Sequence, residues 1–399
     1  MEAQPCFVAA RTVGVELGGG SMNGAGLLRC MRRAAASRSA LAPRRWIVSA
    51  SVANSTKREP GTQPIDWKSL LFSYVPTRCH VQYTYKDGAW SAASLEAEPF
   101  MRVHIGATAL HYGQSCFEGL KAFHCQDGRV RIFRADENSK RMTRSSTRLC
   151  MPEVPEQLFI DAVHTVVREN IDYVPPYGSG GSLYIRPLLF GSGPKIGLAP
   201  ADEYTFLVVV MPVGDYYKGG LSPVTAFVSE GYDRAAPLGV GNAKVGANYA
   251  ADILPNQLSK KQGYPINLYL DPLHHRYIEE FGTSNFVGIK GSEYLTPDSP
   301  SILASITNKS LMQLAPTMGL EVVRRKIDIA EVKEMDEVAA CGTAVVITPV
   351  SRVVYGDELI KVGQDADAVG PTSAKLYAKV RAIQMAEEDD PFNWTQVVE

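Results

Sequence analysis

Short apolar runs rich in β-branched residues recur along this chain and limit the folds it can adopt. The two most apolar runs, Phe206–Val213 and Ala344–Val350, fall short of the roughly 18 to 20 apolar residues needed to cross a bilayer, and they suit buried strands. Beyond Val224, strand patterns alternate with helix patterns, which is typical of a mixed α/β fold. The expected strands are Val224–Ser229, Ile266–Leu270, Asn285–Ile289 and Ala344–Ile347, and the expected helices are Tyr249–Lys261, Asn308–Met318 and Ala374–Met385.

The N-terminal half has its own strands and helices. We expect strands at Val130–Phe133 and Leu183–Ile185, and helices at Asp136–Leu149 and Gln157–Glu169. The glycine-containing stretch Pro212–Gly220 then interrupts the pattern. Because 399 residues exceed one typical domain, we expect a small N-terminal α/β domain at 66–213, an interdomain loop at 214–224 and a large C-terminal domain at 225–399.

The first 60 residues differ from the rest in composition. They are rich in Arg, Ala and Ser, and Glu2 and Glu16 are their only acids before Glu59. This composition predicts an organelle transit peptide that is cleaved on import, to either mitochondrion or plastid. A disordered tail that stays attached is the alternative. The arginines up to residue 45 are Arg11, Arg29, Arg32, Arg33, Arg38, Arg44 and Arg45.

Charge and cysteine usage exclude several classes of protein. The formal net charge of −1 provides no general attraction to nucleic acid or to an anionic membrane. The 7 cysteines form no C-x-x-C motif, so we expect no disulfide framework. The 7 histidines form no H-E-x-x-H motif, and we expect no metal site.

The sharpest local signal is Gly239–Tyr249, in which Lys244 is flanked by small residues that would let a flat ligand approach closely. It is not a convincing dinucleotide motif, because Lys244 takes the place of the third glycine, and no Ser or Thr follows the lysine as in a P-loop. A lysine in such a loop, taken alone, is usually a solvated turn residue.

Two further stretches carry candidate functional groups. Ile278–Phe286 places Glu279 and Glu280 in an apolar, strand-like run, where an acid is costly to bury unless it is paired. Cys341–Ala344 is a turn of small residues whose backbone N–H groups could hold an anion. Thr343 in this turn could equally be an ordinary turn hydroxyl.

Five motifs in consistent order resemble the class IV aminotransferases, and most closely the branched-chain amino-acid aminotransferases. The resemblance runs from about Asp66 to Trp394 and implies a two-domain α/β enzyme of the D-amino-acid-transaminase-like fold, also called fold type IV. The motifs are Leu110–Phe123, Leu183–Pro187, Lys244–Tyr249, Glu280–Asn285 and Gly342–Ala344.

The resemblance implies pyridoxal 5'-phosphate (PLP) as cofactor. Lys244 would hold it as a Schiff base and then act as the base that moves the substrate α-proton. Glu280 would pair with the pyridine nitrogen, whereas strand alternation should point the competing Glu279 to the opposite face. Tyr249 would bond the phenolic oxygen of the cofactor, or else be a core aromatic residue.

Other matched residues would hold the cofactor phosphate. Arg141 and Arg234 would make charge-assisted hydrogen bonds, although Arg141 could instead be a solvated arginine on a charged helix. The backbone amides of Ile306 and Thr307 would meet the phosphate at a helix N-terminus, and Thr343 would add a hydroxyl.

The resemblance also implies a substrate pocket. Thr283 and the Ala344 amide would receive the substrate α-carboxylate, and Tyr112, Phe117 and Tyr184 would form an aromatic wall around a branched aliphatic side chain. Apolar walls distinguish substrates by only ~1–3 kcal/mol per methylene, so leucine, isoleucine and valine should all be accepted.

The co-substrate would be a dicarboxylate, glutamate or 2-oxoglutarate. Arg186 would bind its side-chain carboxylate, unless it makes only a surface salt bridge, and Tyr216 could add to the pocket. Mammalian members carry a C-x-x-C motif where this chain has Val345–Thr348, so we expect no thiol regulation of that kind. The resemblance also implies a homodimer. The alternatives are a D-amino-acid aminotransferase or an aminodeoxychorismate lyase of the same fold, or a non-catalytic binding relative.

Overall fold

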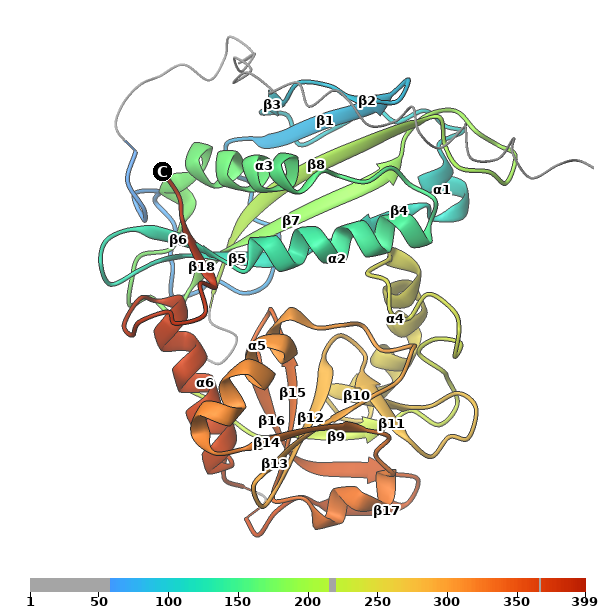
Figure 1. The fold of residues 1–399 in the computed structure, drawn as a ribbon, viewed down its shortest axis with the longest axis vertical. Coiled ribbons are helices and arrows are strands. Elements are labelled where there is room, and N and C mark those ends of the chain that lie inside the picture. The colour runs from blue at the N-terminus through green and yellow to red at the C-terminus, as the bar shows by residue number, and fades with distance from the viewer. Residues whose placement is uncertain (1–57, 215–219, 366) are drawn as a thin grey trace, which may run out of the picture. The chain divides into compact units, whose positions relative to one another are not determined.

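Two nine-stranded sheets organise the part of the chain that the computed structural model describes, which is residues 58–214, 220–365 and 367–399 (Figure 1). In the first sheet every pairing is antiparallel. Its strands are β1 (His80–Lys86), β2 (Ala89–Trp90), β3 (Ser94–Glu96), β4 (Ser115–Phe117), β5 (Leu120–His124), β6 (Val130–Phe133), β7 (Ser182–Gly191), β8 (Glu203–Val213) and β18 (Thr395–Val397). They follow the order β18-β6-β5-β7-β8-β1-β2, with β3 paired to β1 and β4 to β7.

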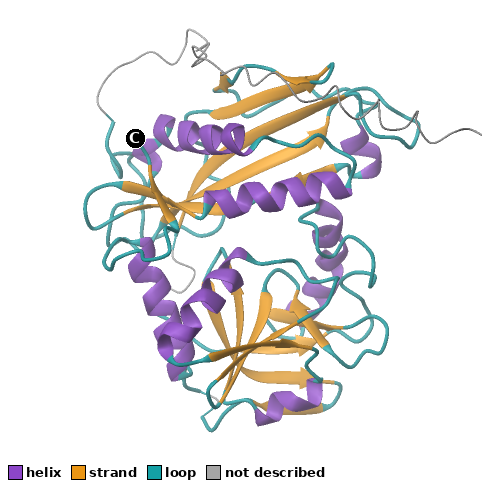
Figure 2. Ribbon diagram, viewed as in Figure 1, coloured by secondary structure: helices purple, strands orange, loops and turns teal. Residues whose placement is uncertain are grey.

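Helices α1 (Thr108–Tyr112), α2 (Ala135–Arg148) and α3 (Glu156–Glu169) and the short 3-10 helix η1 (Ile171–Tyr173) accompany this sheet. In α3, Phe159, Val163 and Val166 recur at helical spacing and are buried, and the helix packs against β1, β7 and β8. Figure 2 shows α2 and α3 lying along these strands.

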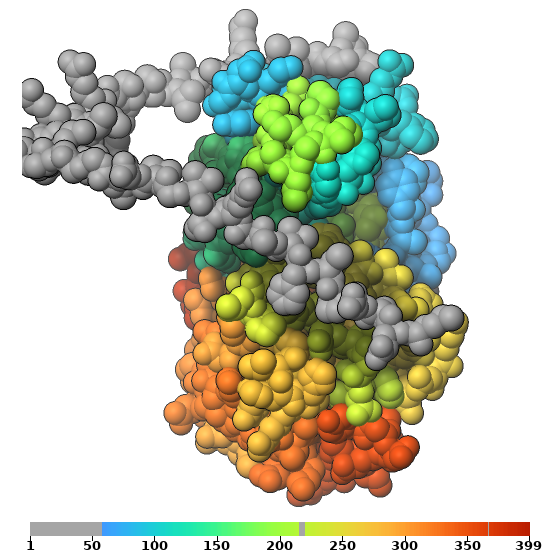
Figure 3. Space-filling model, turned by 90° about the vertical axis from the view of Figure 1, so that its right-hand side faces the viewer, coloured from blue at the N-terminus to red at the C-terminus, as the bar shows by residue number. Residues whose placement is uncertain are grey.

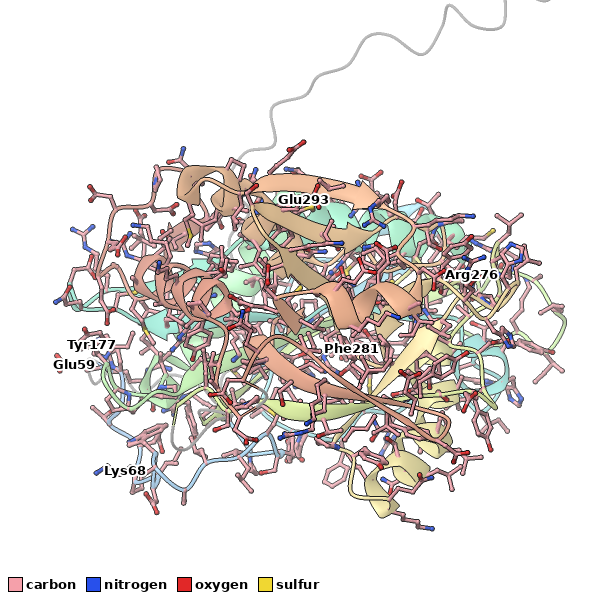
Figure 4. All side chains as sticks on the ribbon, turned by 90° about the horizontal axis from the view of Figure 1, so that it is seen from below. Glu59, Lys68, Tyr177, Arg276, Phe281 and Glu293 are labelled. Carbon is pink, nitrogen blue, oxygen red and sulfur yellow. The ribbon has the colours of Figure 1, made fainter. Side chains whose placement is uncertain are left out.

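The second sheet contains both parallel and antiparallel pairs. Its strands are β9 (Val224–Val228), β10 (Ile266–Leu270), β11 (Ile278–Phe281), β12 (Asn285–Lys290), β13 (Glu293–Pro297), β14 (Glu321–Arg325), β15 (Glu337–Gly342), β16 (Val346–Tyr355) and β17 (Glu358–Lys361). The order is β11-β10-β9-β16-β15-β12-β13-β14, and a further pairing of β11 with β12 closes six strands into a ring. That closing pair is Glu280 with Asn285, so the predicted acid lies at the seam of the ring. In Figure 4, Phe281 on β11 lies among the strands, and Arg276 lies at the periphery.

The helices of the second sheet are α4 (Gly246–Lys261), α5 (Ile306–Leu314) and α6 (Pro371–Gln384), with 3-10 helices η2 (Ala315–Met318) and η3 (Ile329–Glu334). Helix α4 packs against β10, while α5 and α6 pack against β15 and each other. No helix in the described ranges is long and apolar enough to span a membrane. Within the same ranges, no three His, Cys, Asp or Glu side chains gather in a way that could hold a metal ion.

One hydrophobic core joins the two sheets. Phe123 and Phe133 of the first sheet pack in the same cluster as Val287 and Leu311, and Trp394 completes it. An ion pair also links helices of the two sheets: Lys309 on α5 lies 2.5 Å from Glu137 on α2. All described residues therefore lie in one compact unit.

Most expected elements are present, but two expectations need correction. A strand starting at Ala344 is wrong, because residues 343–345 form the turn between β15 and β16. The strand starts at Val346, whose φ of 71° is strained for a β-branched residue. The range 225–399 would place the C-terminus with the second sheet, whereas β18 pairs with β6 in the first. The rest of the domain division stays a prediction. Tyr216 and nearly all of the expected transit peptide lie outside the described residues.

Candidate functional site

The backbone of Lys244 is fixed between β4 and α2. Its carbonyl accepts a hydrogen bond of 3.0 Å from the Phe117 N–H, and its own N–H donates to Ser145 Oγ at 2.9 Å. The next residue, Val245, forms an isolated β-bridge with Cys116. The lysine is therefore held by the first sheet, although α4 begins only two residues later.

The side chain of Lys244 lies between two aromatic rings. Its Nζ donates to Tyr249 Oη at 2.6 Å and lies 4.8 Å from the centre of the Phe117 ring. Burial, and after it the nearby guanidinium of Arg141, lower the pKa of Lys244 to about 8. Burial raises the pKa of Tyr249 to about 12, so this hydroxyl stays neutral near pH 8. Such a lysine can act as a nucleophile or a general base near neutral pH.

Arg141 does not lie on a solvated helix face. It is buried, and its Nε and Nη2 donate to both oxygens of Glu118, at 2.8 and 2.7 Å. Its Nη1 donates to the Ala304 carbonyl at 3.0 Å, while Asn138 Nδ2 donates to Glu118 at 2.7 Å. Glu118 was not among the predicted site residues, although an acid between Phe117 and Gly119 in an apolar run is the same kind of signal as Glu280.

Glu280 lies within a second buried ion pair. Its Oε1 accepts from the Leu303 N–H at 2.8 Å and pairs with Arg234 Nη2 at 2.8 Å, and its Oε2 accepts from Asn285 at 2.9 Å. Burial raises the pKa of Glu280 to about 7, against the opposing effect of Arg234. Arg234, expected at the phosphate, is thus found beside this acid.

The neighbouring acid points the other way, as strand alternation predicts. Glu279 is also buried, but its Oε1 accepts from Ser299 Oγ at 2.8 Å and from Ser301 Oγ at 2.5 Å. It shares no hydrogen-bond donor with Glu280 among the described residues.

The first turn of α5 presents backbone N–H groups to the same region. Ser305 caps this helix, accepting from the Asn308 N–H at 3.2 Å, and Ile306 and Thr307 are its first residues. Together with Gly119, Asn138 and Thr343, Ile306 and Thr307 line a small cavity of about 20 Å³. The cavity thus joins the first sheet to α5 and to the turn after β15.

An aromatic group extends the site along β7. Tyr184 is buried, and its Oη accepts from Arg186 Nη2 at 2.9 Å. The guanidinium of Arg186 also lies 4.6 Å from the centre of the Phe117 ring. Any side chain at Gly119 would collide with the Tyr184 hydroxyl, which explains why glycine is needed there. Among the residues that the structure describes, Arg186 forms no ion pair, and its contacts are the Tyr184 hydroxyl and the Phe117 ring.

The remaining expected residues lie at the margin. Thr283 is exposed and lies in the turn beside Gly342, while the exposed Ala344 accepts a hydrogen bond of 2.7 Å from Lys121 Nζ. Tyr112 is exposed and donates to the Ile196 carbonyl. In the described ranges, no hydrogen bond or ring contact joins Tyr112 to Phe117 or Lys244.

The site suits a ligand that carries a dianion such as phosphate. The site has more cationic groups than carboxylates, and the buried Nε of Arg234 has no hydrogen-bond partner among the described residues. The cations are Lys244, Arg141, Arg186 and Arg234. The first amides of α5 have no acceptors within their own helix. Unsatisfied donors and excess positive charge together favour an anion.

Comparison with known proteins identifies the family. The class IV aminotransferase family matches residues 115–353. A branched-chain-amino-acid aminotransferase from Haemophilus influenzae is 44% identical over 342 residues, covering 84% of this chain and 99% of that protein. The chloroplastic branched-chain-amino-acid aminotransferase 5 of Arabidopsis thaliana is 40% identical, covering 86% of this chain and 83% of that protein.

Solved structures agree with the fold. The crystal structure of the Escherichia coli branched-chain amino acid aminotransferase superposes with a TM-score of 0.67 at 27% identity, covering 80% of this chain and all of that one. This likeness confirms the expected α/β fold. The chain therefore belongs to the class IV aminotransferases, and its cofactor is pyridoxal 5'-phosphate.

Proposed function

We propose that this chain is a branched-chain L-amino-acid aminotransferase that exchanges the amino group between leucine, isoleucine or valine and 2-oxoglutarate. The observation that carries the proposal is the environment of Lys244, whose Nζ is hydrogen-bonded to Tyr249, lies against Phe117 and has its pKa lowered to about 8. Relatives such as those from Haemophilus influenzae and Arabidopsis thaliana carry this activity in their names.

The residues of the site divide the task of holding the cofactor. Arg141, Thr343 and the amides of Ile306 and Thr307 would bind the phosphate, and Glu280 would face the ring nitrogen. A phosphate contact from Arg234 stays a prediction. When bound, pyridoxal phosphate supplies the carbon that accepts the amino group and a ring that withdraws electrons.

Lys244 would carry both the cofactor and the proton. With a pKa of about 8, an appreciable fraction of Lys244 is neutral near neutral pH, so Nζ can accept the substrate α-proton and return it. The Tyr249 hydroxyl, 2.6 Å away, orients Nζ toward the reacting centre. The two aromatic rings restrict water around Nζ, which strengthens each of these interactions.

The pocket would bind both substrates in turn. Phe117 and Tyr184 provide apolar surface for a branched side chain, and Thr283 and the Ala344 amide would receive its α-carboxylate. Arg186 lacks an ion pair among the described residues, which leaves it available for the second carboxylate of glutamate. The comparisons do not favour a D-amino-acid aminotransferase, an aminodeoxychorismate lyase or a non-catalytic relative.

A homodimer is part of this proposal. Exposed apolar side chains lie where two segments meet. An isolated bridge joins Pro194 to Ala107, the residue before α1, and Tyr112 at the end of α1 donates to the Ile196 carbonyl. Figure 3 shows this face, with the green segment beside the teal one. Large exposed apolar patches mark protein interfaces, and pairing of two copies would also cover Tyr112. The members are Phe100, Ile105, Leu110, Tyr112, Ile196 and Leu198.

Light scattering tests this assembly. Wild-type enzyme should have twice the chain mass, and a double substitution Ile105→Asp with Leu198→Asp should yield monomers. A monomeric wild type would refute the dimer.

We also propose that the enzyme acts in an organelle, plastid or mitochondrion, because residues 1–60 have the composition of a transit peptide. Some plant relatives are named as chloroplastic. Residues 1–60 fused to a fluorescent protein should direct it to one of these organelles, and a diffuse cytosolic signal would refute the assignment.

Steady-state kinetics test the reaction itself. With 2-oxoglutarate as acceptor, leucine, isoleucine and valine should give kcat/KM values within about two orders of magnitude of one another, since pocket differences of ~1–3 kcal/mol per methylene allow no more. D-Alanine should give no glutamate. Activity with D-alanine and none with leucine would overturn the proposed substrate class.

A further inference from the structure

The site contains a buried acid that the proposed chemistry does not use. Glu279 is only 3% exposed, yet its Oε2 has no hydrogen-bond partner among the described residues. Both of its hydrogen bonds are accepted by Oε1, from the hydroxyls of Ser299 and Ser301. Burying a carboxylate is costly, so these two contacts need an explanation.

The two serines begin a segment that has neither helical nor strand pairing. Residues 298–305 connect β13 to α5 without regular structure. Few backbone hydrogen bonds fix the start of the segment: Asp298 N–H donates to the Arg325 carbonyl at 3.1 Å, and Ile302 N–H donates to Ser299 at 3.4 Å. The two hydrogen bonds to Glu279 are therefore a main part of what fixes residues 299–301, beside the contact from Arg234 to the Ser301 carbonyl.

The same segment contacts the charged groups of the site. The Ser301 carbonyl accepts from Arg234, and the Ala304 carbonyl accepts from Arg141 at 3.0 Å. The Leu303 N–H donates to Glu280 at 2.8 Å.

It also leads directly into the first turn of α5. The Leu303 carbonyl accepts from Asn285 Nδ2 at 3.0 Å, and Asn285 also donates to Glu280. Ser305 then caps α5, whose first amides are the expected phosphate ligands. Arg234, Arg141 and Glu280 are therefore each hydrogen-bonded to the backbone of one segment, residues 299–305.

We propose that Glu279 is a positioning residue that anchors segment 299–305 and thereby holds Arg234, Glu280, Arg141 and the N-terminus of α5 in the geometry that binds the cofactor. This inference rests on the proposed function, because it assigns a purpose to the segment only if those groups hold pyridoxal phosphate. Glu279 itself would contact neither substrate nor cofactor, since its hydrogen-bond partners lie on the face of β11 opposite to those of Glu280.

The acceptor oxygen, and not the charge, is what the anchor needs. Oε1 makes both contacts, whereas Oε2 accepts no hydrogen bond from any described residue. Glu279→Gln keeps an acceptor at the position of Oε1 and places its amide at that of Oε2. Glu279→Ala removes both hydrogen bonds.

The test compares Glu279→Ala and Glu279→Gln with the control Glu337→Ala. Glu337 is an equally buried acid in the same sheet, but it accepts from the Thr372 and Ser373 amides at the start of α6, both at 2.7 Å. Two quantities are measured: hydrogen exchange of the peptide covering 299–305 in cofactor-free protein, and the dissociation constant for pyridoxal phosphate.

We expect Glu279→Ala to accelerate exchange in this peptide and to weaken cofactor binding by about tenfold, because two hydrogen bonds that position the segment are lost. Glu279→Gln should restore both quantities to within about threefold, and Glu337→Ala should lower the melting temperature without changing either. Unchanged exchange and affinity in Glu279→Ala, or equal changes in Glu337→Ala, would overturn the proposal.

Two further outcomes have defined consequences. If Glu279→Ala does not fold, Ser301→Ala, which removes one of the two donors, takes its place with the same expectations. If wild-type protein binds no pyridoxal phosphate, the proposed function fails, and the exchange measurement in cofactor-free protein still decides whether Glu279 anchors the segment.

Discussion

The buried pair of Glu118 and Arg141 gives the largest stability effect expected for a single substitution in the site. Glu118 is fully buried and receives both arginine hydrogen bonds, at 2.8 and 2.7 Å. Glu118→Leu would leave the guanidinium buried without its carboxylate, which costs about 3–5 kcal/mol. At ~2–4 °C per kcal/mol, the melting temperature should fall by roughly 10 °C.

A double substitution distinguishes the cost of an unpaired buried charge from the cost of lost packing. Replacing a buried ion pair by apolar residues of similar size is often neutral, so Glu118→Leu combined with Arg141→Met should recover most of the lost stability. The double variant should nevertheless bind pyridoxal phosphate poorly, because it lacks the phosphate arginine.

Urea unfolding of cofactor-free protein measures these free energies. Glu334→Leu serves as control, since its ion pair with Lys290 is exposed, and it should change stability far less. A loss below about 1 kcal/mol in Glu118→Leu, or no recovery in the double variant, would refute the reasoning.

Three further predictions concern charges in the site. Because burial lowers the pKa of Lys244 from 10.5 to about 8, protonation of this lysine destabilises the folded cofactor-free enzyme progressively as pH falls from 10.5 to 8. Lys244→Met should therefore raise the free energy of unfolding at pH 7 by about 3 kcal/mol, and the gain should shrink toward pH 10. Burial raises the pKa of Glu280 from 4.5 to about 7, so the free energy of unfolding of the wild type should fall as pH rises through that interval. This fall should be smaller in Glu280→Gln, as urea unfolding at pH 4 and pH 8 would show, and an equal fall in both proteins would contradict the shift. Arg186→Met should raise KM for 2-oxoglutarate by about 10- to 100-fold with little effect on the leucine half-reaction, and equal losses for both substrates would contradict its role.

Local patterns predicted much of the fold. Ile266–Leu270 and Val130–Phe133 are strands with the predicted bounds, because short apolar runs between turn residues leave few alternatives. Strand β18 was not predicted, since its three residues pair with β6, more than 260 positions earlier. Ala344 was misplaced because the turn before β16 uses a left-handed Val346, which local propensity disfavours.

The site was predictable where a residue type is chemically unusual for its surroundings. Lys244 in a glycine-rich loop and Glu280 in an apolar run fall in this class, and the structure brings both into one cluster with Arg141. Glu118 is likewise an acid in an apolar run, but it was predicted only as part of the Leu110–Phe123 motif, without a role of its own. The anchoring role of Glu279 had no local signal, because its partners Ser299 and Ser301 lie 20 and 22 residues away.

The most direct test of the account is the visible absorbance of purified enzyme and of Lys244→Ala, before and after addition of L-leucine. We predict a yellow wild type that bleaches with leucine and regains its colour with 2-oxoglutarate, and a variant that cannot complete the cycle. A wild type that responds to D-alanine but not to leucine would contradict the proposed substrate, and a Lys244→Ala variant that cycles like wild type would contradict the central role of Lys244.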